Sequence, residues 1–348
     1  STKLAERRID DMLVTHLTHV RYLSGFSGSN GAMLVSKDRT AAIATDGRYT
    51  TQIAEEVPDI RATIERNVAV AMLSKAADGH RVGFEADYVS VSLLEKLREA
   101  CPDGVTLVPV SGVIEDIRLT KDNVELTRLT EAAELSVRAL DELLGAGELR
   151  AGRTECEVAA DLEYRMRVLG AERVSFDTIV ASGPNSAKPH HGAGDRVIAE
   201  GDLVTIDFGM HRLGFNSDMT RTFAIGEIGS LEHEIYEVTL AAQLAGVTAA
   251  VPGAKLADVD KACRDVIEDA GYGEYFVHST GHGVGLDVHE APSAAKTGEG
   301  TLAEGMTLTI EPGIYIPGKA GVRIEDTLII TAAAPKVITD YTKDLTVL

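Results

Sequence analysis

Short apolar runs alternate with helical patterns over the first third of the chain. The runs are three or four residues long, which is typical of strands, and segments with helical periodicity separate some of them. Strands that alternate with helices are the pattern of a mixed α/β domain. We therefore predict such a domain over residues 1–118, with strands at 12–14, 33–35, 41–44, 81–84 and 105–108 and helices near 47–56 and 89–100.

A different pattern begins near residue 122, where longer amphipathic helices are predicted. Asp122 and Glu125 have the spacing of a helix N-terminal capping box, and so do Thr154 and Glu157. The second of these helices should stop at Gly170, because glycine favours helix ends. We expect a second domain over residues 122–348, a domain boundary at about 117–122, helices at 231–250 and 256–270, and strands at 202–209, 219–225, 307–311 and 321–330.

Composition and charge narrow the possible functions. The 348 residues exceed what one hydrophobic core usually organises, which agrees with two domains. A formal net charge of −20 opposes binding to nucleic-acid phosphates, so we expect no nucleic-acid partner. No apolar stretch approaches the roughly 20 residues that a membrane span needs, so no membrane segment is expected.

The cysteines and the first residues indicate the cellular compartment. Cys101, Cys156 and Cys263 are odd in number and far apart, which suits neither a disulfide framework nor a thiolate zinc site. Residues 1–10 are mostly polar and lack the apolar core of a signal peptide. We therefore expect a cytoplasmic protein.

Two aspartates lie in β-rich runs joined by a short turn that contains Gly214. If the runs form an antiparallel hairpin, Asp207 and Asp218 lie opposite each other on one face, about 5 Å apart. Carboxylates that close repel, and a divalent cation or protonation of one partner relieves the repulsion. The alternative is a pair of solvent-facing aspartates on an exposed sheet, and these two residues alone do not decide between the two interpretations.

Three further residues favour a metal centre. Glu311 and Glu325 lie on the polar faces of two later runs, and the Pro-Gly pair directly after Glu311 predicts a bend. His282 lies between two glycines in a histidine-rich segment. Taken alone, each glutamate is more simply interpreted as a solvent-facing strand residue. Taken alone, the histidine-rich segment is interpreted as a loop that contains several histidines by chance. Together, four carboxylates and one imidazole suit two divalent ions, with manganese, cobalt, zinc and iron all compatible.

These residues lie in five segments that follow one another along the chain: IDFG, NSDMTRTF, GHGVGLDVHE, EPGIYIP and GVRIEDT. Together the segments closely resemble the pita-bread metallopeptidases, within them the proline-specific branch of aminopeptidase P and prolidase. The resemblance spans the chain from about residue 122 to its end. More loosely, YLSGFSGSNGAMLV and ATDGRY resemble the smaller N-terminal domain of creatinase and aminopeptidase P relatives. The resemblance implies an α+β fold with a C-terminal pita-bread domain and a smaller N-terminal creatinase-like α/β domain.

The resemblance also implies a metal centre with two divalent ions per subunit. Manganese is favoured, and cobalt, zinc or iron are the alternatives. Glu311 would serve in addition as a proton shuttle, and Arg323 would orient carboxylates and contribute to substrate binding. The ligands that the resemblance implies are Asp207, Asp218, His282, Glu311 and Glu325.

Four other histidines receive roles from the resemblance. His190 or His191 would contact the substrate and the transition state, and His190 is preferred because it lies 17 residues before the first metal ligand. His289 would hold the peptide carbonyl or the proline side, and His278 would line the pocket. Outside this set of motifs, all four would be taken for surface or packing residues.

The implied reaction is hydrolysis of the bond between an N-terminal residue and a following proline. Prolidases commonly meet the free carboxylate of a dipeptide with an arginine shortly after the second loop histidine, but here that stretch offers only Lys296. We therefore predict an Xaa-Pro aminopeptidase that acts on short proline-containing peptides. Xaa-Pro dipeptidase is the alternative, and a metal-free creatinase-type hydrolase or a non-catalytic peptide-binding module is more remote. A homodimer is expected.

Overall fold

The computed structural model describes residues 2–348. Contacts within the chain divide it into two compact units, Ser1–Ile117 and Arg118–Leu348. The division falls inside the short helix α6 (Glu115–Arg118).

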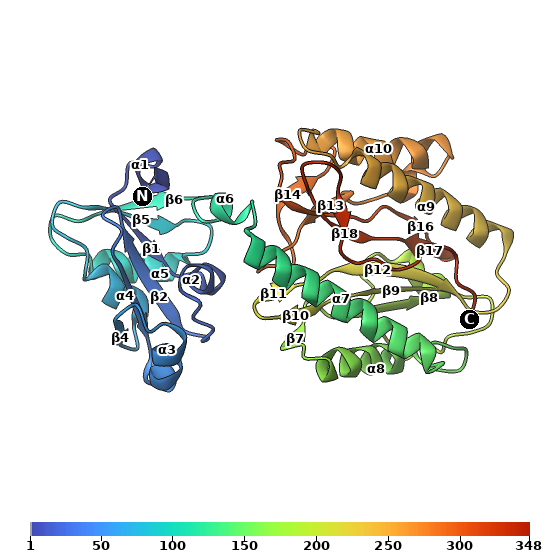
Figure 1. The fold of residues 1–348 in the computed structure, drawn as a ribbon, viewed down its shortest axis with the longest axis horizontal. Coiled ribbons are helices and arrows are strands. Elements are labelled where there is room, and N and C mark those ends of the chain that lie inside the picture. The colour runs from blue at the N-terminus through green and yellow to red at the C-terminus, as the bar shows by residue number, and fades with distance from the viewer. Residues whose placement is uncertain (1) are drawn as a thin grey trace. The chain divides into compact units, whose positions relative to one another are not determined.

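A six-stranded mixed sheet forms the N-terminal unit, with the strand order β4-β3-β2-β1-β5-β6 (Figure 1). Consecutive residues of β1 enter different apolar clusters, Leu13 one and Val14 the other, because side chains alternate along a strand. Both faces of the sheet are therefore covered. The strands are β1 (Asp11–Val14), β2 (Gly31–Ser36), β3 (Ala41–Thr45), β4 (Ala62–Ile64), β5 (Arg81–Glu85) and β6 (Thr106–Val110).

Short helices connect these strands. The structure agrees with the five predicted strands and the two predicted helices of this unit, while β4 and three of the helices carried no clear sequence pattern. The helices are α1 (Thr2–Glu6), α2 (Leu17–Ser24), α3 (Thr50–Glu56), α4 (Val68–Leu73) and α5 (Val91–Glu99).

Two pairs of helices cover the strands of the C-terminal unit (Figure 1). Helices α7 (Asn123–Gly145) and α8 (Glu155–Val168) pack through one apolar cluster, and α9 (Ser230–Ala249) and α10 (Leu256–Asp269) pack through a second. Both predicted capping boxes are present: the Asp122 carboxylate accepts from the backbone of Val124 and Glu125, and the Thr154 hydroxyl accepts from the backbone of Glu157. These local hydrogen bonds fix where α7 and α8 begin.

The register between two strands differs from the predicted hairpin. In the antiparallel pair of β9 (Leu203–Phe208) and β12 (Met219–Ala224), Asp207 lies opposite Thr220, and Asp218 directly precedes β12. The prediction that the two aspartates lie opposite each other was wrong because the connecting residues form their own pairing, β10 (Met210–Arg212) with β11 (Phe215–Asn216). Asp218 precedes Thr220 by two residues, so in an extended chain both side chains face the same side.

The predicted strand at 321–330 is also corrected. It consists of β17 (Ala320–Arg323), which pairs with β16 (Gly313–Ile316), and β18 (Asp326–Ile329), which pairs with β15 (Thr307–Ile310). The break falls at Glu325, because its backbone N–H leaves this pairing and donates to the carbonyl of Thr220 at 3.1 Å.

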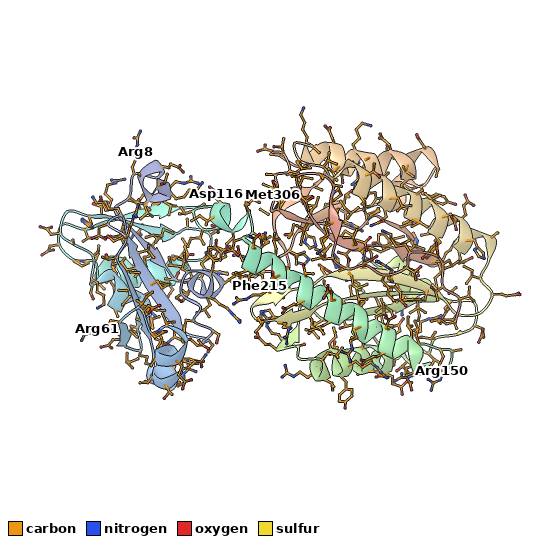
Figure 2. The ribbon with its side chains drawn as sticks, in the orientation of Figure 1. Arg8, Arg61, Asp116, Arg150, Phe215 and Met306 are labelled. Atoms are coloured by element: carbon orange, nitrogen blue, oxygen red, sulfur yellow. The ribbon has the colours of Figure 1, made fainter. Side chains whose placement is uncertain are left out.

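The remaining strands complete the C-terminal unit. Phe215 and Met306 are buried in this unit, whereas the side chain of Arg150 is exposed (Figure 2). In the N-terminal unit, Arg8 and Arg61 are likewise exposed. Among residues 2–348, none of the helices has the length and apolar character needed to span a membrane.

The remaining strands of the C-terminal unit are β7 (Arg173–Val174), β8 (Ile179–Ser182), β13 (Gly281–Gly283), β14 (Glu290–Ala294) and β19 (Lys336–Val337).

Candidate active site

Three carboxylates from separate strands meet at one point of the C-terminal unit. Asp207 lies near the end of β9, Asp218 directly before β12, and Glu325 in the break between β17 and β18. One oxygen from each lies within 4.8 Å of the others, a spacing that could hold a metal ion. The strand break brings Glu325 into this group, because its backbone bridges to the strand that follows Asp218.

His282 and Glu311 extend the group. The Nε2 atom of His282 lies 3.2 Å from Glu311 Oε1 and 3.7 Å from Asp218 Oδ2. His282, Glu311 and Glu325 form a second set with the spacing of metal ligands, and Asp218, His282 and His289 form a third. The structure thus brings together all five residues that the resemblance assigns to the metal ions.

Glycines allow the strand that carries His282 to approach its neighbours. A Cβ atom at Gly281 would lie 1.8 Å from the carbonyl oxygen of Thr309, and one at Gly283 would lie 2.1 Å from that of Ala291. Any other residue at either position would push His282 away from the carboxylates.

The hydrogen bonds of these side chains suit a cation. His282 Nδ1 lies 3.0 Å from the carbonyl oxygen of Gly283, which can only accept, so Nδ1 carries a hydrogen and Nε2 is the nitrogen that faces the carboxylates and could bind a metal ion. Asp207 Oδ1 and Glu325 Oε1 are buried and find no donor within residues 2–348. A buried acceptor without a donor destabilises the fold unless it binds a cation, so these residues fit divalent metal ions.

The charge states of these carboxylates also fit a site for cations. Burial, followed by repulsion from neighbouring carboxylates, raises the pKa of Asp218 and that of Glu325 well above the usual values, and burial also raises the pKa of Asp207. Burial opposes ionisation of Glu311 as well, but the hydrogen bond and charge of His282 outweigh it and lower the pKa of Glu311 to about 2. Without metal, some of these carboxylates therefore hold protons that a metal ion would displace.

Arg323 begins a chain of hydrogen bonds that ends at His278. Its guanidinium donates to Asp207 Oδ2 at 2.6 Å and to the Tyr315 hydroxyl at 2.8 Å. Tyr315 lies 2.8 Å from His278 Nε2, and His278 Nδ1 lies 2.7 Å from the carbonyl oxygen of Ser279. Because that carbonyl can only accept, His278 Nδ1 donates and Nε2 accepts from Tyr315. Burial lowers the pKa of His278, which agrees with a neutral ring held in one orientation.

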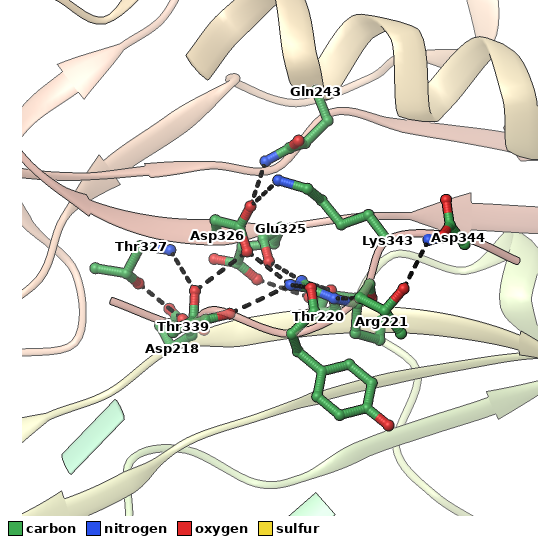
Figure 3. A network of polar contacts seen from close by, with 12 residues as sticks. Asp218, Thr220, Arg221, Gln243, Glu325, Asp326, Thr327, Thr339, Lys343 and Asp344 are labelled. Carbon is green, nitrogen blue, oxygen red and sulfur yellow. Dashed lines mark hydrogen bonds and ion pairs between the residues drawn. The ribbon is translucent and has the colours of Figure 1, made fainter. Parts of the chain in front are cut away.

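A buried polar network supports Glu325 through its backbone and through the neighbouring Asp326 (Figure 3). Arg221 donates to the backbone carbonyl of Glu325 and, at 2.7 Å, to the carboxylate of Asp326. Lys343 and Gln243 donate to the other Asp326 oxygen at 2.6 and 2.9 Å. These bonds fix the backbone at the strand break and directly after it, and with it the position of the Glu325 side chain.

His289 is positioned through the residue that follows it. Glu290 accepts from Arg118 and, at 2.6 Å, from Lys121, at the start of the C-terminal unit. The His289 ring packs edge-on against His282, with 4.4 Å between the ring centroids. Burial lowers the pKa of His289, so the neutral ring is favoured.

A pocket of about 450 Å³ opens at the metal-binding group. The five grouped residues line it, and so do the other residues predicted for the site: His190, His191, His278, His289 and Arg323. Lys296 does not line it. The lining residues are Phe176, Asp177, Ile179, Pro189, His190, His191, Gly192, Asp207, Asp218, His278, Ser279, His282, His289, Glu311, Arg323 and Glu325.

Glu155 holds the pocket loop at His191. Its buried carboxylate lies 2.7 Å from His191 Nε2 and accepts from the backbone N–H of Gly194 at 3.3 Å. Its other oxygen accepts from the backbone and hydroxyl of Ser182 and from Asn185. His191 is therefore tied to the fold, whereas His190 has no such tie among the hydrogen bonds of residues 2–348.

Sequence reasoning missed Glu155, Tyr315 and Asp177. Tyr315 lies inside the EPGIYIP segment, where its hydroxyl was the available signal. Glu155 directly follows the N-cap of a helix, a position where an acidic residue is ordinary, and only the fold reveals its partners.

Comparison with known protein families follows the two units. Residues 127–332 match the model of metallopeptidase family M24, and residues 1–120 match that of the creatinase/prolidase N-terminal domain. The chain belongs to metallopeptidase family M24. The predicted α+β fold, a pita-bread domain preceded by a creatinase-like domain, is confirmed. As an M24 metallopeptidase the protein is an enzyme that uses divalent metal ions, and the grouped carboxylates and imidazoles could hold them.

Individual relatives cover nearly the whole chain. An Xaa-Pro dipeptidase of Pyrococcus furiosus is 38% identical, over 98% of this chain and 96% of the relative. The structure of an Xaa-Pro dipeptidase from Bacillus anthracis matches with a TM-score of 0.94 and 40% identity, over 100% of this chain and 97% of that one. An X-Pro aminopeptidase from Thermotoga maritima matches with a TM-score of 0.90 and 34% identity, over the full length of both chains.

Proposed function

We propose that the protein is an Xaa-Pro dipeptidase that uses two divalent metal ions. The observation that carries the proposal is the group of Asp207, Asp218, His282, Glu311 and Glu325 in a pocket of about 450 Å³. Full-length relatives named Xaa-Pro dipeptidase support this specificity over the aminopeptidase predicted from the sequence. Manganese, a homodimer and a cytoplasmic location remain predictions.

The five grouped residues would hold the ions between them. When bound, the ions would polarise the peptide carbonyl and activate water for hydrolysis. Glu311 is the proton carrier in this proposal, because Thr309 and His282 contact only its Oε1 atom. Its Oε2 atom is therefore available to take up a proton and to return it to the proline nitrogen as the peptide bond breaks.

The pocket histidines would bind the peptide. His190 and His289 line the pocket and have ring nitrogens available to donate to the peptide carbonyl and to the charge that develops on it. His278 would act through Tyr315, which holds its neutral ring in place. Arg323 would orient Asp207 and so act on the substrate indirectly.

An Xaa-Pro aminopeptidase is the second candidate, and one observation favours it. Arg323 is the pocket's only arginine or lysine among residues 2–348, and its guanidinium is already paired with Asp207. The free carboxylate of a dipeptide would thus lack a strong cationic partner inside this pocket, whereas a longer peptide places no carboxylate there.

The experiment that separates the candidates compares two peptides with the same first residue. We would measure kcat/KM for Ala-Pro and for Ala-Pro-Ala with the manganese-loaded enzyme. A dipeptidase cleaves Ala-Pro at least tenfold better. A higher kcat/KM for the tripeptide would make the protein an aminopeptidase.

A further inference from the structure

One pocket carboxylate lies outside the metal-binding groups. Asp177 lines the pocket and is exposed, yet it belongs to none of the sets of residues with metal-ligand spacing. Within the part of the chain that the structure describes, residues 2–348, its carboxylate makes no hydrogen bond or ion pair. It is therefore a charged group that the fold itself does not use.

Asp177 lies in the pocket close to the strands that carry the proposed metal ligands. Ile179, the first residue of β8, lies directly opposite Asp207 of β9, so both side chains face the same side. Asp177 precedes Ile179 by two residues and also lines the pocket, whereas the intervening Thr178 is buried and does not. Asp177 therefore lies on the pocket side of the chain, two positions before the residue opposite a proposed ligand.

The charges of the pocket leave Asp177 without a partner. The other four carboxylates of the lining belong to the proposed metal ligands, and Asp207 is in addition paired with Arg323. Arg323 is the pocket's only guanidinium or ammonium group in residues 2–348. A cationic side chain that pairs with Asp177 inside the pocket would therefore have to come from the substrate.

The substrate class limits where that cation can be. This step rests on the proposed function, cleavage before proline. Proline carries no positive side chain, so a cation in an Xaa-Pro peptide lies on the first residue, as its α-ammonium group or as the side chain of lysine or arginine. The α-ammonium group is common to all such peptides, so only a side-chain contact distinguishes between them. We propose that Asp177 binds the cationic side chain of the substrate's first residue and makes the enzyme selective for peptides that begin with lysine or arginine.

The expected effect follows from the exposure of the pair. Exposed ion pairs contribute up to about 1 kcal/mol, which corresponds to about a fivefold change in kcat/KM, and a pair that excludes water inside a pocket contributes more. Lys-Pro should therefore be cleaved about five to ten times better than norleucine-Pro, which has a side chain of similar length without the charge. Glu-Pro should be the poorest of the three.

The experiment measures kcat/KM for these three peptides with the metal-loaded wild type, Asp177→Asn and Asp177→Lys. Asp195→Asn is the matched control, because Asp195 is an exposed aspartate near the pocket loop that does not line the pocket. Thermal unfolding of each variant checks that the fold is unchanged. Asp177→Asn should remove the preference for Lys-Pro, Asp177→Lys should favour Glu-Pro, and the control should keep the wild-type ratios.

The peptide series identifies the group that Asp177 binds. A loss in Asp177→Asn confined to Lys-Pro assigns the contact to the side chain, and an equal loss for Lys-Pro and norleucine-Pro would contradict the proposed selectivity, because the α-ammonium group is common to both peptides. Unchanged kcat/KM values for every peptide in both Asp177 variants would overturn the inference. A wild type that cleaves no Xaa-Pro peptide at all would contradict the proposed function instead.

Discussion

Replacing Glu155 with glutamine tests how the pocket loop is held. The carboxylate is fully buried, and burial opposes its ionisation. Hydrogen bonds from Ser182, Asn185 and His191 outweigh the burial and lower the pKa of Glu155. The residue is therefore ionised in the folded protein at neutral pH, and its charge is balanced by donors from the loop.

The loss of stability expected for Glu155→Gln follows from the contacts of each Glu155 carboxylate oxygen. Glutamine keeps an acceptor for Ser182 and Asn185, but its NH₂ group would face His191 Nε2 and the N–H of Gly194, at present 2.7 and 3.3 Å from a carboxylate oxygen. A hydrogen bond to a charged group contributes about 1.5–3 kcal/mol, and the Gly194 bond is long. We expect the free energy of unfolding to fall by about 2–4 kcal/mol.

The activity of Glu155→Gln should fall without loss of metal. The substitution loosens the loop that carries His190 and His191, whereas every proposed metal ligand lies on other elements. We expect kcat/KM for Ala-Pro to fall about tenfold, which corresponds to about 1.4 kcal/mol.

Urea unfolding, steady-state kinetics and metal analysis measure these effects together. Glu163→Gln is the control, because Glu163 lies on the same helix and its side chain makes no hydrogen bond or ion pair within residues 2–348. The stability difference between wild type and Glu155→Gln should shrink as the pH falls through the lowered pKa of Glu155, since a depressed pKa stabilises only above it. A loss of less than about 1 kcal/mol in the free energy of unfolding, with unchanged kcat/KM, would show that Glu155 does not hold the pocket loop.

Three further predictions concern the metal site and its histidines. Asp218→Asn should keep the fold but lose at least one metal ion and more than 99% of the activity, because an amide has the same shape without the charge; full activity with two ions bound would contradict the ligand assignment. His190→Ala should lower kcat with metal content unchanged and more than His191→Ala does, and a larger kcat defect in His191→Ala would reverse the preference for His190. The pKa values of Asp218 and Glu325 are raised in the metal-free fold, so these groups favour folding at low pH and oppose it as the pH rises. Manganese should therefore raise the Tm more at pH 8 than at pH 5.5, and its binding should release protons. Calorimetry in buffers of different ionisation enthalpy measures this release, and binding without proton release would contradict the prediction.

Local signals explain which elements the sequence predicted well. The starts of α7 and α8 depend on Asp122 and Thr154, whose hydrogen-bond partners lie two or three residues away along the chain. Strand alternation likewise placed Asp207 and Asp218 on one face, although the register was wrong. Such features are encoded in a few neighbouring residues and can be recognised without the fold.

Long-range contacts explain what the sequence did not predict. The break at Glu325 exists because its backbone bonds to Thr220, more than one hundred positions earlier in the chain. The role of Glu155 depends on partners from a loop that returns to its helix after 27 to 39 residues. Glu325 was recognised from its motif, but neither the bond of its backbone to Thr220 nor the partners of Glu155 have a local sequence pattern, so only tertiary structure reveals these contacts.

The most direct test of the central claim is a metal titration followed by hydrolysis of Ala-Pro. The enzyme is dialysed against a chelator, its residual metal is measured, and manganese is added in steps while released proline is assayed. We expect no hydrolysis by the metal-free protein and a rise in rate that reaches its plateau at two ions per chain. Hydrolysis without metal, or two bound ions without cleavage of any Xaa-Pro peptide, would contradict it.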